Sequence, residues 1–478
     1  MRSRMLSGVK LWYTSGMNWL KRLIRYPEIW ILTIAALATR LFQLQLPPAI
    51  VFDETYFRTF AGHYLDGQYF FDIHPPLVKL VFAGFANILG LGPEQLINDD
   101  PAGVALRVLP ALAGAALVPL VYIIIRQFGL GRRVATLGAL FVLLDNALLV
   151  ESRFILMDSI LLLTGLGALA SYLMLRRSTH YRRWVWVVIT ALLISLLVST
   201  KWSGLAVAGL IAGLWLVDGV RRRIDWKRLV GEGLVTVLIV VTVYISLFMV
   251  HFALLPKTGD GDAFMSPKFR SLLIDSPVYD ENVRMAFWDK FVELNEEMYT
   301  AQSSLNDVSH PYSSAWYTWP IQLRGVYYWQ GPTTDAGLQG HIYLLGNPVV
   351  WWGSLLGVLS ASVIWLARPR LLGARRNLVA FLLAGYAVNF VPFAFIDRPM
   401  FLYHYFFALV FAILLSCVLL SRLFDWQNRK YGKKAVTYTT WAIGIVTLLA
   451  FLYFLPISYG LPLSQADLQQ RMWLSTWR

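Results

Sequence analysis

Two adjacent acids, Asp53 and Glu54, follow the first long apolar stretch of this 478-residue chain. If the pair is helical, the two side chains point about 100° apart, so one carboxylate can face a cavity while neighbours hold the other. A carboxyl group at a membrane boundary, between aromatic residues, should have a raised pKa and can serve as a general base. A solvated acidic pair or a helix N-cap is the alternative.

A second polar cluster contains Asp72 and His74, followed by Pro75-Pro76. The proline pair predicts an extended entry into the next helix, which holds His74 at a fixed point near Asp72. The two side chains are therefore candidates for binding a donor or an acceptor substrate. A turn that starts a helix explains the same residues without any chemistry.

The third cluster runs from Glu151 to Asp158 and includes Arg153. The bidentate fork of Arg153 suits a phosphate group, with Asp158 as a further candidate for substrate binding. An ion pair of Arg153 with Glu151 or Asp158 that orders the turn is an equally good explanation. In the fourth cluster, Lys201 is the only basic residue of segment 199–205, where it either binds a phosphate or extends to lipid headgroups.

The fifth cluster contains Arg398, Tyr403 and His404 at the entry to another apolar stretch. Burying such groups costs several kcal/mol unless partners exist. Arg398 and His404 are therefore candidates for binding a donor phosphate, and Tyr403 for binding donor or acceptor. A polar belt with tyrosines at the membrane interface is the alternative.

The composition identifies the elements that must position these clusters. Hydrophobic residues make up 57% of the chain and charged residues 15%, which excludes a soluble or a disordered protein. Eleven stretches are candidates for membrane-spanning helices, which need about 20 apolar residues each. They are residues 29–46, 102–125, 134–150, 155–175, 184–199, 203–219, 229–250, 349–366, 377–395, 400–420 and 437–457. Residues 77–91 are apolar but short, so we expect an interfacial or re-entrant helix there.

The basic residues are concentrated in six segments that alternate with the other loops. These segments hold 27 of the 42 Lys and Arg residues and comprise residues 1–28, 126–133, 176–183, 221–228, 368–376 and 422–434. The positive-inside rule predicts a cytoplasmic N-terminus and, after eleven crossings, an extracytoplasmic C-terminus. All five polar clusters then share the outer face. The net charge of +14 thus indicates topology, and no nucleic-acid partner is predicted.

The two long loops of the outer face are acidic and aromatic. Residues 47–100 contain seven acidic and two basic residues, and residues 251–347 contain eleven and six. We therefore divide the chain into an N-terminal membrane half (1–250) that includes the candidate catalytic loop, a large external loop (251–348) and C-terminal membrane helices (349–478). The sequence has no nucleotide-binding fingerprint, no metal-ligand cluster of defined spacing and a single Cys, so no metal site or cofactor is predicted.

One or two carboxylates and several cations beside long apolar helices suit a lipid-phosphate substrate. The lipid tail would lie along the helices, with the phosphate at Arg153, Lys201 or Arg398. A carboxylate then deprotonates an incoming hydroxyl while the cations stabilise the departing phosphate. This chemistry is glycosyl transfer from a polyprenyl-phosphate sugar, and a single displacement would invert the anomeric centre.

At these positions the sequence resembles the protein O-mannosyltransferase family, a group of membrane-embedded glycosyltransferases with the GT-C fold. The motifs occur in the family's order between about residues 50 and 405. They are Phe52-Asp53-Glu54, Phe71 to Leu80, Lys201-Trp202-Ser203-Gly204, Gly346-Asn347-Pro348 and Arg398 to Tyr405. The resemblance implies an all-α polytopic membrane protein with about eleven membrane-spanning helices, long external loops and a cytosolic N-terminus.

The resemblance also implies an activity, which is transfer of mannose from polyprenyl-phosphate mannose to Ser or Thr hydroxyls of secreted or membrane proteins. It implies that Asp53 is the base, that Glu54 beside it binds acceptor or donor, and that Arg153 is the family's essential arginine before span four. Family members can pair with homologues, so the resemblance is compatible with a homodimer or a heterodimer.

One departure concerns the large loop after span seven. Eukaryotic members carry a MIR domain, a β-trefoil, in this loop, whereas residues 251–347 are too few for such a domain and its flanks. The chain therefore looks like a bacterial member without a MIR domain, located in the plasma membrane with its site facing outward.

Two alternatives stay open. A related GT-C transferase, similar to the lipid A modifying aminoarabinose transferases, would move a sugar from the same class of donor to a lipid or a glycan. A flippase or transporter of lipid-linked sugars would place charges near the bilayer midplane and show two-fold repeats. Asp145, with Arg40 and Arg107 near helix ends, is the only hint of such a protein.

Overall fold

The computed structural model describes residues 25–98, 101–221, 224–304 and 310–477. Eight helical segments of these residues are long and apolar enough to cross a membrane. The last of them contains two of the predicted spans, because α18 (Phe406–Tyr459) is interrupted at Gly432, where φ is 78°. The predicted helical membrane protein is confirmed, while the number of crossings stays a prediction.

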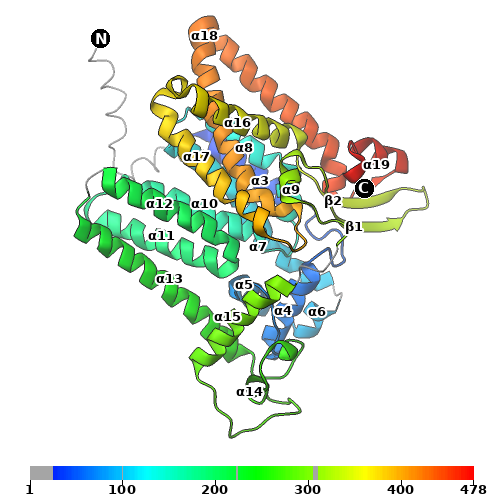
Figure 1. The fold of residues 1–478 in the computed structure, drawn as a ribbon. Helices are drawn as coiled ribbons and strands as arrows, with labels where there is room; N and C mark the ends of the chain where they lie inside the picture. Colours follow the sequence, from blue (N-terminus) through cyan, green and yellow to red (C-terminus); the bar gives the residue numbers. More distant parts are fainter. Residues whose placement is uncertain (1–24, 99–100, 222–223, 305–309, 478) are drawn as a thin grey trace.

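The helices that carry the predicted spans pack into a bundle (Figure 1). They are α3 (Pro27–Leu41), α7 (Val108–Gln127), α8 (Arg132–Leu143), α9 (Asn146–Glu151), α10 (Asp158–Leu175), α11 (His180–Thr200), α12 (Leu205–Arg221), α13 (Trp226–Leu254), α16 (Pro348–Ala367), α17 (Arg376–Val388) and α18. On α13, Leu234, Val237 and Leu238 are 65%, 60% and 66% exposed. Such an apolar exposed face is typical of a helix that contacts lipid.

Shorter elements complete the chain. The α-helices are α4 (Glu54–Asp66), α5 (Leu77–Ile88), α6 (Pro93–Ile97), α14 (Pro267–Arg270), α15 (Phe287–Ser304) and α19 (Gln465–Arg471). The 3-10 helices are η2 (Pro101–Arg107), η3 (Trp202–Gly204), η4 (Asp262–Phe264), η6 (Trp316–Ile321), η7 (Pro369–Arg375), η8 (Val391–Phe395), η9 (Leu402–Tyr405) and η10 (Ser475–Trp477). The short apolar stretch predicted at 77–91 is α5, which is 12 residues long.

A three-stranded antiparallel sheet is an element that the sequence analysis did not predict. It has the order β1 (Val326–Thr333), β2 (Gln339–Leu344), β3 (Pro462–Leu463). At the start of β1, buried Val326 and Tyr328 alternate with half-buried neighbours, a pattern typical of a strand with one face on the core. Gly337, at a φ of 74°, lies in the turn between β1 and β2. The sheet places part of segment 251–348 against the bundle (Figure 1).

A polar junction divides the span predicted at 134–150 into α8 and α9. Asp145 is buried there and accepts hydrogen bonds from the Leu148 N–H (2.9 Å), the Asn347 N–H (3.0 Å) and Nε1 of Trp351 (2.8 Å). The side chain of Asn347 in turn caps α16. The carboxylate that hinted at a transporter thus joins helices to one another.

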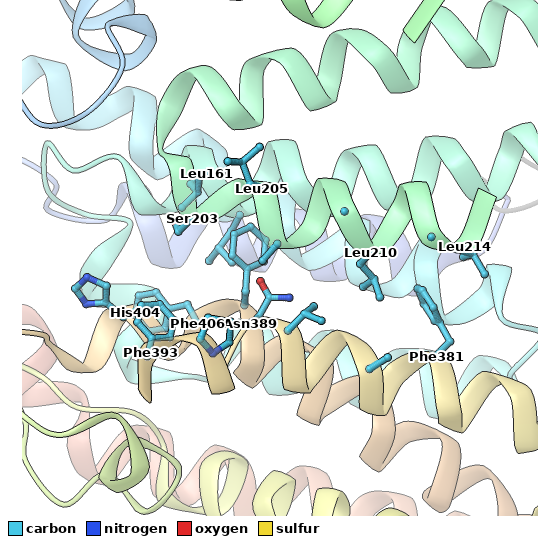
Figure 2. Close-up of a pocket in the computed structure, with 18 of the residues that line it drawn as sticks. Leu161, Ser203, Leu205, Leu210, Leu214, Phe381, Asn389, Phe393, His404 and Phe406 are labelled. Carbon is cyan, nitrogen blue, oxygen red and sulfur yellow. The ribbon is translucent and has the colours of Figure 1, made fainter. Parts of the chain in front are cut away.

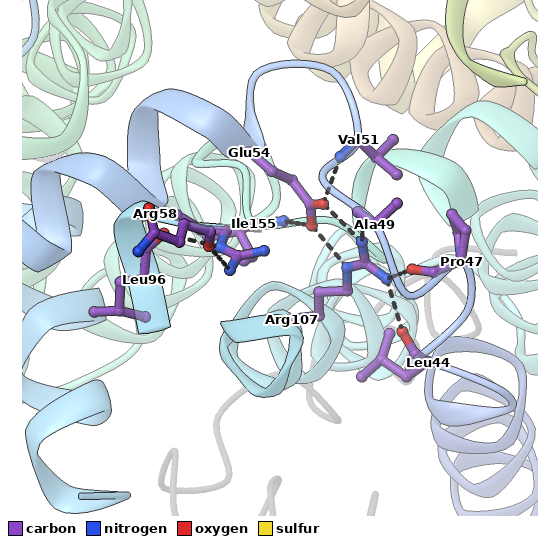
Figure 3. A network of polar contacts seen from close by, with 10 residues as sticks. Leu44, Pro47, Ala49, Val51, Glu54, Arg58, Leu96, Arg107 and Ile155 are labelled. Carbon is purple, nitrogen blue, oxygen red and sulfur yellow. Dashed lines mark hydrogen bonds and ion pairs between the residues drawn. The ribbon is translucent and has the colours of Figure 1, made fainter. Parts of the chain in front are cut away.

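The loop before α4 is held by a wholly buried ion pair (Figure 3). Glu54 accepts two hydrogen bonds from Arg107 at 2.7 Å and one each from the N–H groups of Val51 and Ile155 at 2.9 Å. Arg107 also donates to three carbonyl oxygens of residues 44–49. Both side chains are 0% exposed, so the pair fastens this loop to the start of α7 and to the segment before α10.

Arg153 closes the end of α3. Its guanidinium donates to the carbonyl oxygens of Arg40 (3.2 Å), Phe42 (2.7 Å) and Gln43 (3.0 Å). The guanidinium carbon lies 4.3 Å from the centre of the Tyr459 ring. The last carbonyls of a helix lack partners within the helix and carry its negative dipole end, so an arginine stabilises them. The ion pair with a neighbouring acid, offered as an alternative by the sequence, is not among these contacts.

Replacing Arg107 by Met should lower the free energy of unfolding by about 3–5 kcal/mol, because the Glu54 carboxylate would stay buried without its cation. The midpoint of thermal unfolding of the full chain in detergent measures this loss. Asp66→Asn is the matched control, since Asp66 pairs with Lys257 at 3.6 Å in a partly exposed position. Such a pair contributes about 1 kcal/mol or less. Equal unfolding midpoints for the two variants would show that the Glu54–Arg107 ion pair does not stabilise the fold.

Arg153→Lys should lower the free energy of unfolding by about 2–4 kcal/mol, because one ammonium group cannot serve carbonyl oxygens in the directions that the guanidinium reaches. The same unfolding midpoint, measured without any substrate, reports the change. Arg370→Lys, at an exposed position, should leave the midpoint unaltered. A substrate-free midpoint equal to that of the parent would show that Arg153 does not hold α3.

Candidate active site

The structure brings seven of the ten predicted site residues to one cavity of about 800 Å³, here called the polar cavity. They are Asp53, Asp72, His74, Asp158, Lys201, Arg398 and Tyr403. These residues come from five separate parts of the chain, which the bundle places at one end. The convergence expected from their shared face is therefore observed.

Asp53 precedes the first residue of α4 and follows Phe52, whose φ of 51° is left-handed. A bulky residue rarely adopts this conformation, so the surrounding structure must hold it. The Phe52 ring stacks on Tyr328 at 4.4 Å between ring centres. Burial raises the pKa of Asp53 to about 6; Lys201 lowers it, and Asp158 and Asp72 raise it further. Among the described residues, none donates a hydrogen bond to the Asp53 carboxylate or forms an ion pair with it.

Lys201 is buried directly after the last residue of α11. Its Nζ lies 3.5 Å from Oδ1 of Asp158 and 5.5 Å from the centre of the Tyr403 ring. Asp158 is the first residue of α10, so the pair joins the ends of two neighbouring helices at the wall of the cavity.

Arg398 lies in the segment between η8 and η9 and is half-buried. Burial lowers the pKa of its guanidinium, which nevertheless stays charged because arginine begins far above neutral pH. Its side chain has no hydrogen bond or ion pair within the described part of the chain. A charged group with unused donors on a cavity wall is ready to bind an anion.

Asp72 and His74 are held by Lys79, a buried residue in the first turn of α5. Lys79 forms an ion pair with Asp72 and donates to the His74 carbonyl oxygen at 2.6 Å. Burial lowers the pKa of His74 well below its usual value, with Lys201, Lys79 and Arg398 adding to the effect. Burial therefore favours the neutral imidazole over the imidazolium at His74.

Glu151 also lines the polar cavity and was not among the predicted site residues. Its carboxylate is buried and accepts a hydrogen bond of 2.6 Å from the Tyr328 hydroxyl. Burial raises the pKa of Glu151, and Asp158 raises it further. The position of Glu151 at the end of an apolar stretch could have identified it as a site residue. No such signal marks Tyr328, because it lies on strand β1, which was not predicted.

An apolar groove of about 910 Å³ adjoins the polar cavity. Asp158, Lys201 and Tyr403 line both, so the two spaces meet at these residues. Figure 2 shows His404 at one end of the groove and Leu214 and Phe381 at the other. α10, α12 and α17 provide most of the wall, and most of the side chains that line it are apolar.

Three predicted site residues lie elsewhere. His404 lines the groove instead of the polar cavity, with its Nδ1 3.2 Å from the Phe401 nitrogen. Glu54 and Arg153 line neither space and are engaged by Arg107 and by the end of α3, as described above. No group of three or more His, Cys, Asp or Glu side chains in the described ranges is arranged to hold a metal ion.

Solved structures share this fold at low sequence identity. The S. cerevisiae protein O-mannosyltransferase Pmt1-Pmt2 complex bound to the sugar donor matches with a TM-score of 0.83 and 20% identity, over 94% of this chain and 92% of that chain. ArnT from Cupriavidus metallidurans bound to undecaprenyl phosphate matches with a TM-score of 0.50 and 17% identity, over 92% and 70%. The predicted GT-C fold is confirmed.

Curated relatives match a part of the chain. Mannosyltransferase 4 of Candida albicans, a dolichyl-phosphate-mannose–protein mannosyltransferase, is 30% identical over 282 residues, which are 54% of this chain and 37% of the relative. Protein O-mannosyltransferase 1 of Drosophila pseudoobscura pseudoobscura is 35% identical over 262 residues, which are 51% and 29%. The matched region thus spans less than half the length of these relatives.

Two family models match the chain in succession. The model of dolichyl-phosphate-mannose-protein mannosyltransferase matches residues 30–256. The model of the C-terminal four-TMM region of protein-O-mannosyltransferase matches residues 287–477. The two matches leave out only the ends and a short middle segment, and the chain therefore belongs to the protein O-mannosyltransferase family.

Proposed function

We propose that the chain transfers mannose from polyprenyl-phosphate mannose to Ser or Thr hydroxyls of exported proteins, with inversion at the anomeric carbon. One observation carries the proposal: a carboxylate with a raised pKa, without a partner in the described residues, faces a cavity that opens onto an apolar groove. The family membership and the names of the relatives support the sugar, the donor and the protein acceptor.

In this proposal Asp53 is the general base. It takes the proton of the acceptor hydroxyl, whose oxygen forms a bond to C1 of mannose. The bond between C1 and the phosphate oxygen breaks, and the electron pair leaves with the polyprenyl phosphate. Base and cations act on opposite sides of the reacting carbon, so proton removal and charge stabilisation occur in one displacement.

The other acids of the site support the choice of Asp53. Asp158 is paired with Lys201, and Asp72 with Lys79. Glu151 accepts the Tyr328 hydroxyl. Each of these carboxylates thus already has a partner, whereas Asp53 has none among the described residues.

The donor is placed by charge and by apolar surface. Its phosphate would contact Lys201 and Arg398, and its prenyl chain would lie in the groove beyond Tyr403 and His404. Asp72 and His74 line the remaining wall and are proposed to contact the sugar or the acceptor. Glu54 and Arg153 are proposed to act indirectly, by holding the loop that carries Asp53 and the end of α3.

The orientation and the assembly are part of the proposal. The distribution of Lys and Arg supports a cytoplasmic N-terminus and a polar cavity on the outer side of a bacterial plasma membrane. The S. cerevisiae structure of this fold is a complex of two related chains, which supports pairing with a homologue.

The Asp53→Asn variant should lose at least about 100-fold in transfer rate, because the amide cannot accept the proton. The assay supplies the purified full chain with mannosyl-phosphoryl polyprenol and a Thr-rich peptide and measures a mass gain of one hexose on the peptide. Asp335→Asn, in the exposed β1–β2 turn, is the matched control and should retain the parent rate. Full activity of Asp53→Asn would remove Asp53 from the mechanism.

A measurement of donor affinity distinguishes the proposed role of Asp53 as a base from the proposed role of the cations in binding the donor phosphate. Asp53→Asn should bind the donor with the affinity of the parent. Arg398→Gln should bind the donor with an affinity lower by at least about tenfold, because a charge-assisted contact to the phosphate is lost. Transfer to a lipid or glycan without transfer to any peptide would favour the related-transferase alternative.

The pH dependence follows from the raised pKa of Asp53. The base acts as the carboxylate, so kcat/KM should fall below pH 6 and reach a plateau above it. Lys201 lowers the pKa of Asp53, so Lys201→Gln should move the inflection to higher pH. The pH–rate profiles of the two proteins measure both effects. An inflection that stays in place in Lys201→Gln would assign it to another group.

A further inference from the structure

A second polar space lies at the other end of the apolar groove. It has a volume of about 960 Å³ and is here called the arginine cavity after the side chains that line it, which are Arg176, Arg177, Arg183, Arg221 and Arg228. Leu214, Val217 and Phe381 line both the groove and this cavity, so the two spaces are continuous. The proposed transfer reaction uses none of these arginines.

The two polar spaces lie at opposite ends of the same helices. Asp158 begins α10 at the polar cavity, and Arg176 follows the last residue of α10 at the arginine cavity. α10 has 18 residues, which at 1.5 Å per residue span about 27 Å. This length is close to the hydrocarbon thickness of a bilayer, about 30 Å. If α10 spans the bilayer, this length places the arginine cavity at the headgroup level of the membrane face opposite the polar cavity.

The arginines of the cavity outnumber the carboxylates that form ion pairs with them. Asp218 accepts from Arg176 at 3.0 Å, and Glu232 accepts from Arg183 at 2.6 Å and from Arg228 at 3.1 Å. Among the described residues, the five arginines that line the cavity and these two carboxylates leave an excess of three positive charges. The acids therefore hold part of the cluster in place without neutralising it.

Arg221 occupies the junction between the arginine cavity and the groove, because it lines both. Its side chain is exposed, and within the described ranges it forms no hydrogen bond or ion pair. A guanidinium with unused donors therefore faces a polar space that continues into an apolar one. A phospholipid matches this arrangement, because its negatively charged phosphate is followed by an apolar acyl chain.

We propose that the arginine cavity binds the phosphate headgroup of an anionic membrane phospholipid, with an acyl chain entering the groove past Leu214, Val217 and Phe381. Basic pockets between membrane helices are suited to such headgroups, since several guanidiniums share the negative charge of the phosphate. The headgroup site is separate from the cations proposed to bind the donor phosphate, while the acyl chain enters the opposite end of the groove proposed for the prenyl chain. The occupant comes from the membrane leaflet opposite the polar cavity.

Binding of defined lipids to the full chain in detergent tests the proposal by native mass spectrometry. The probes are phosphatidylglycerol, phosphatidylcholine with the same acyl chains, and inorganic phosphate. We expect phosphatidylglycerol to bind at least about fivefold more tightly than phosphatidylcholine, because only the former carries a net negative charge. Equal binding of the two lipids, or binding of inorganic phosphate as tight as that of phosphatidylglycerol, would overturn the proposal.

Variants locate the binding. Arg221→Gln/Arg228→Gln should weaken phosphatidylglycerol binding by about tenfold or more, because two cations near the phosphate are lost. Arg221→Lys/Arg228→Lys keeps both charges and should retain most of the affinity. The matched control Arg133→Gln/Arg429→Gln removes two exposed charges outside the cavity. An equal loss in this control would place the lipid elsewhere and overturn the proposal.

A groove variant tests the chain-binding part. Val217→Trp fills the junction and should weaken phosphatidylglycerol binding at least about fivefold. Unchanged affinity in this variant would overturn the proposed path of the acyl chain. None of these measurements reads the transfer rate, so their outcome is independent of the proposed reaction.

Discussion

A charged side chain buried beside hydrocarbon is costly unless an ion pair or a hydrogen bond compensates it. This constraint separates the polar residues that hold the walls of the site from those that are available to bind a substrate. Glu54 is met by Arg107, and the buried Lys79 is met by a carboxylate and a carbonyl oxygen. Asp53 and Arg398 line the polar cavity without such a partner in the described residues. The paired charges fix the walls, and the two unpaired ones are available to a substrate.

The fold was predictable where it depends on local solvent preference. A long run of apolar residues must leave water, either in lipid or against other helices, and each predicted span corresponds to helical structure. The shared face of the polar clusters followed from the basic loops alone. Asp53 and Arg398 are far apart in the sequence, yet a bundle that crosses a bilayer brings same-face loops to one end.

The roles of individual side chains depended on contacts that the sequence does not display. For Asp53 and Glu54 we argued from helical spacing, but the left-handed backbone of Phe52 makes Asp53 the residue before α4 instead of a helical one. The expected division, with one acid facing a cavity and one held, is nevertheless observed. Arg153 was equally ambiguous, because no sequence pattern reveals that α3 ends with carbonyl oxygens at its guanidinium.

Strand β1 shows why the external loop cannot be treated as an attachment to the membrane helices. No strand was predicted there, yet Tyr328 reaches the site and makes two contacts. Its ring stacks on Phe52 and its hydroxyl binds Glu151. The loop of Asp53 is thus held from one side by this strand and from the other by the Glu54–Arg107 pair. The Asp53 carboxylate has no partner among the described residues, and it is positioned through its two neighbours in the sequence, Phe52 and Glu54, which are both fixed.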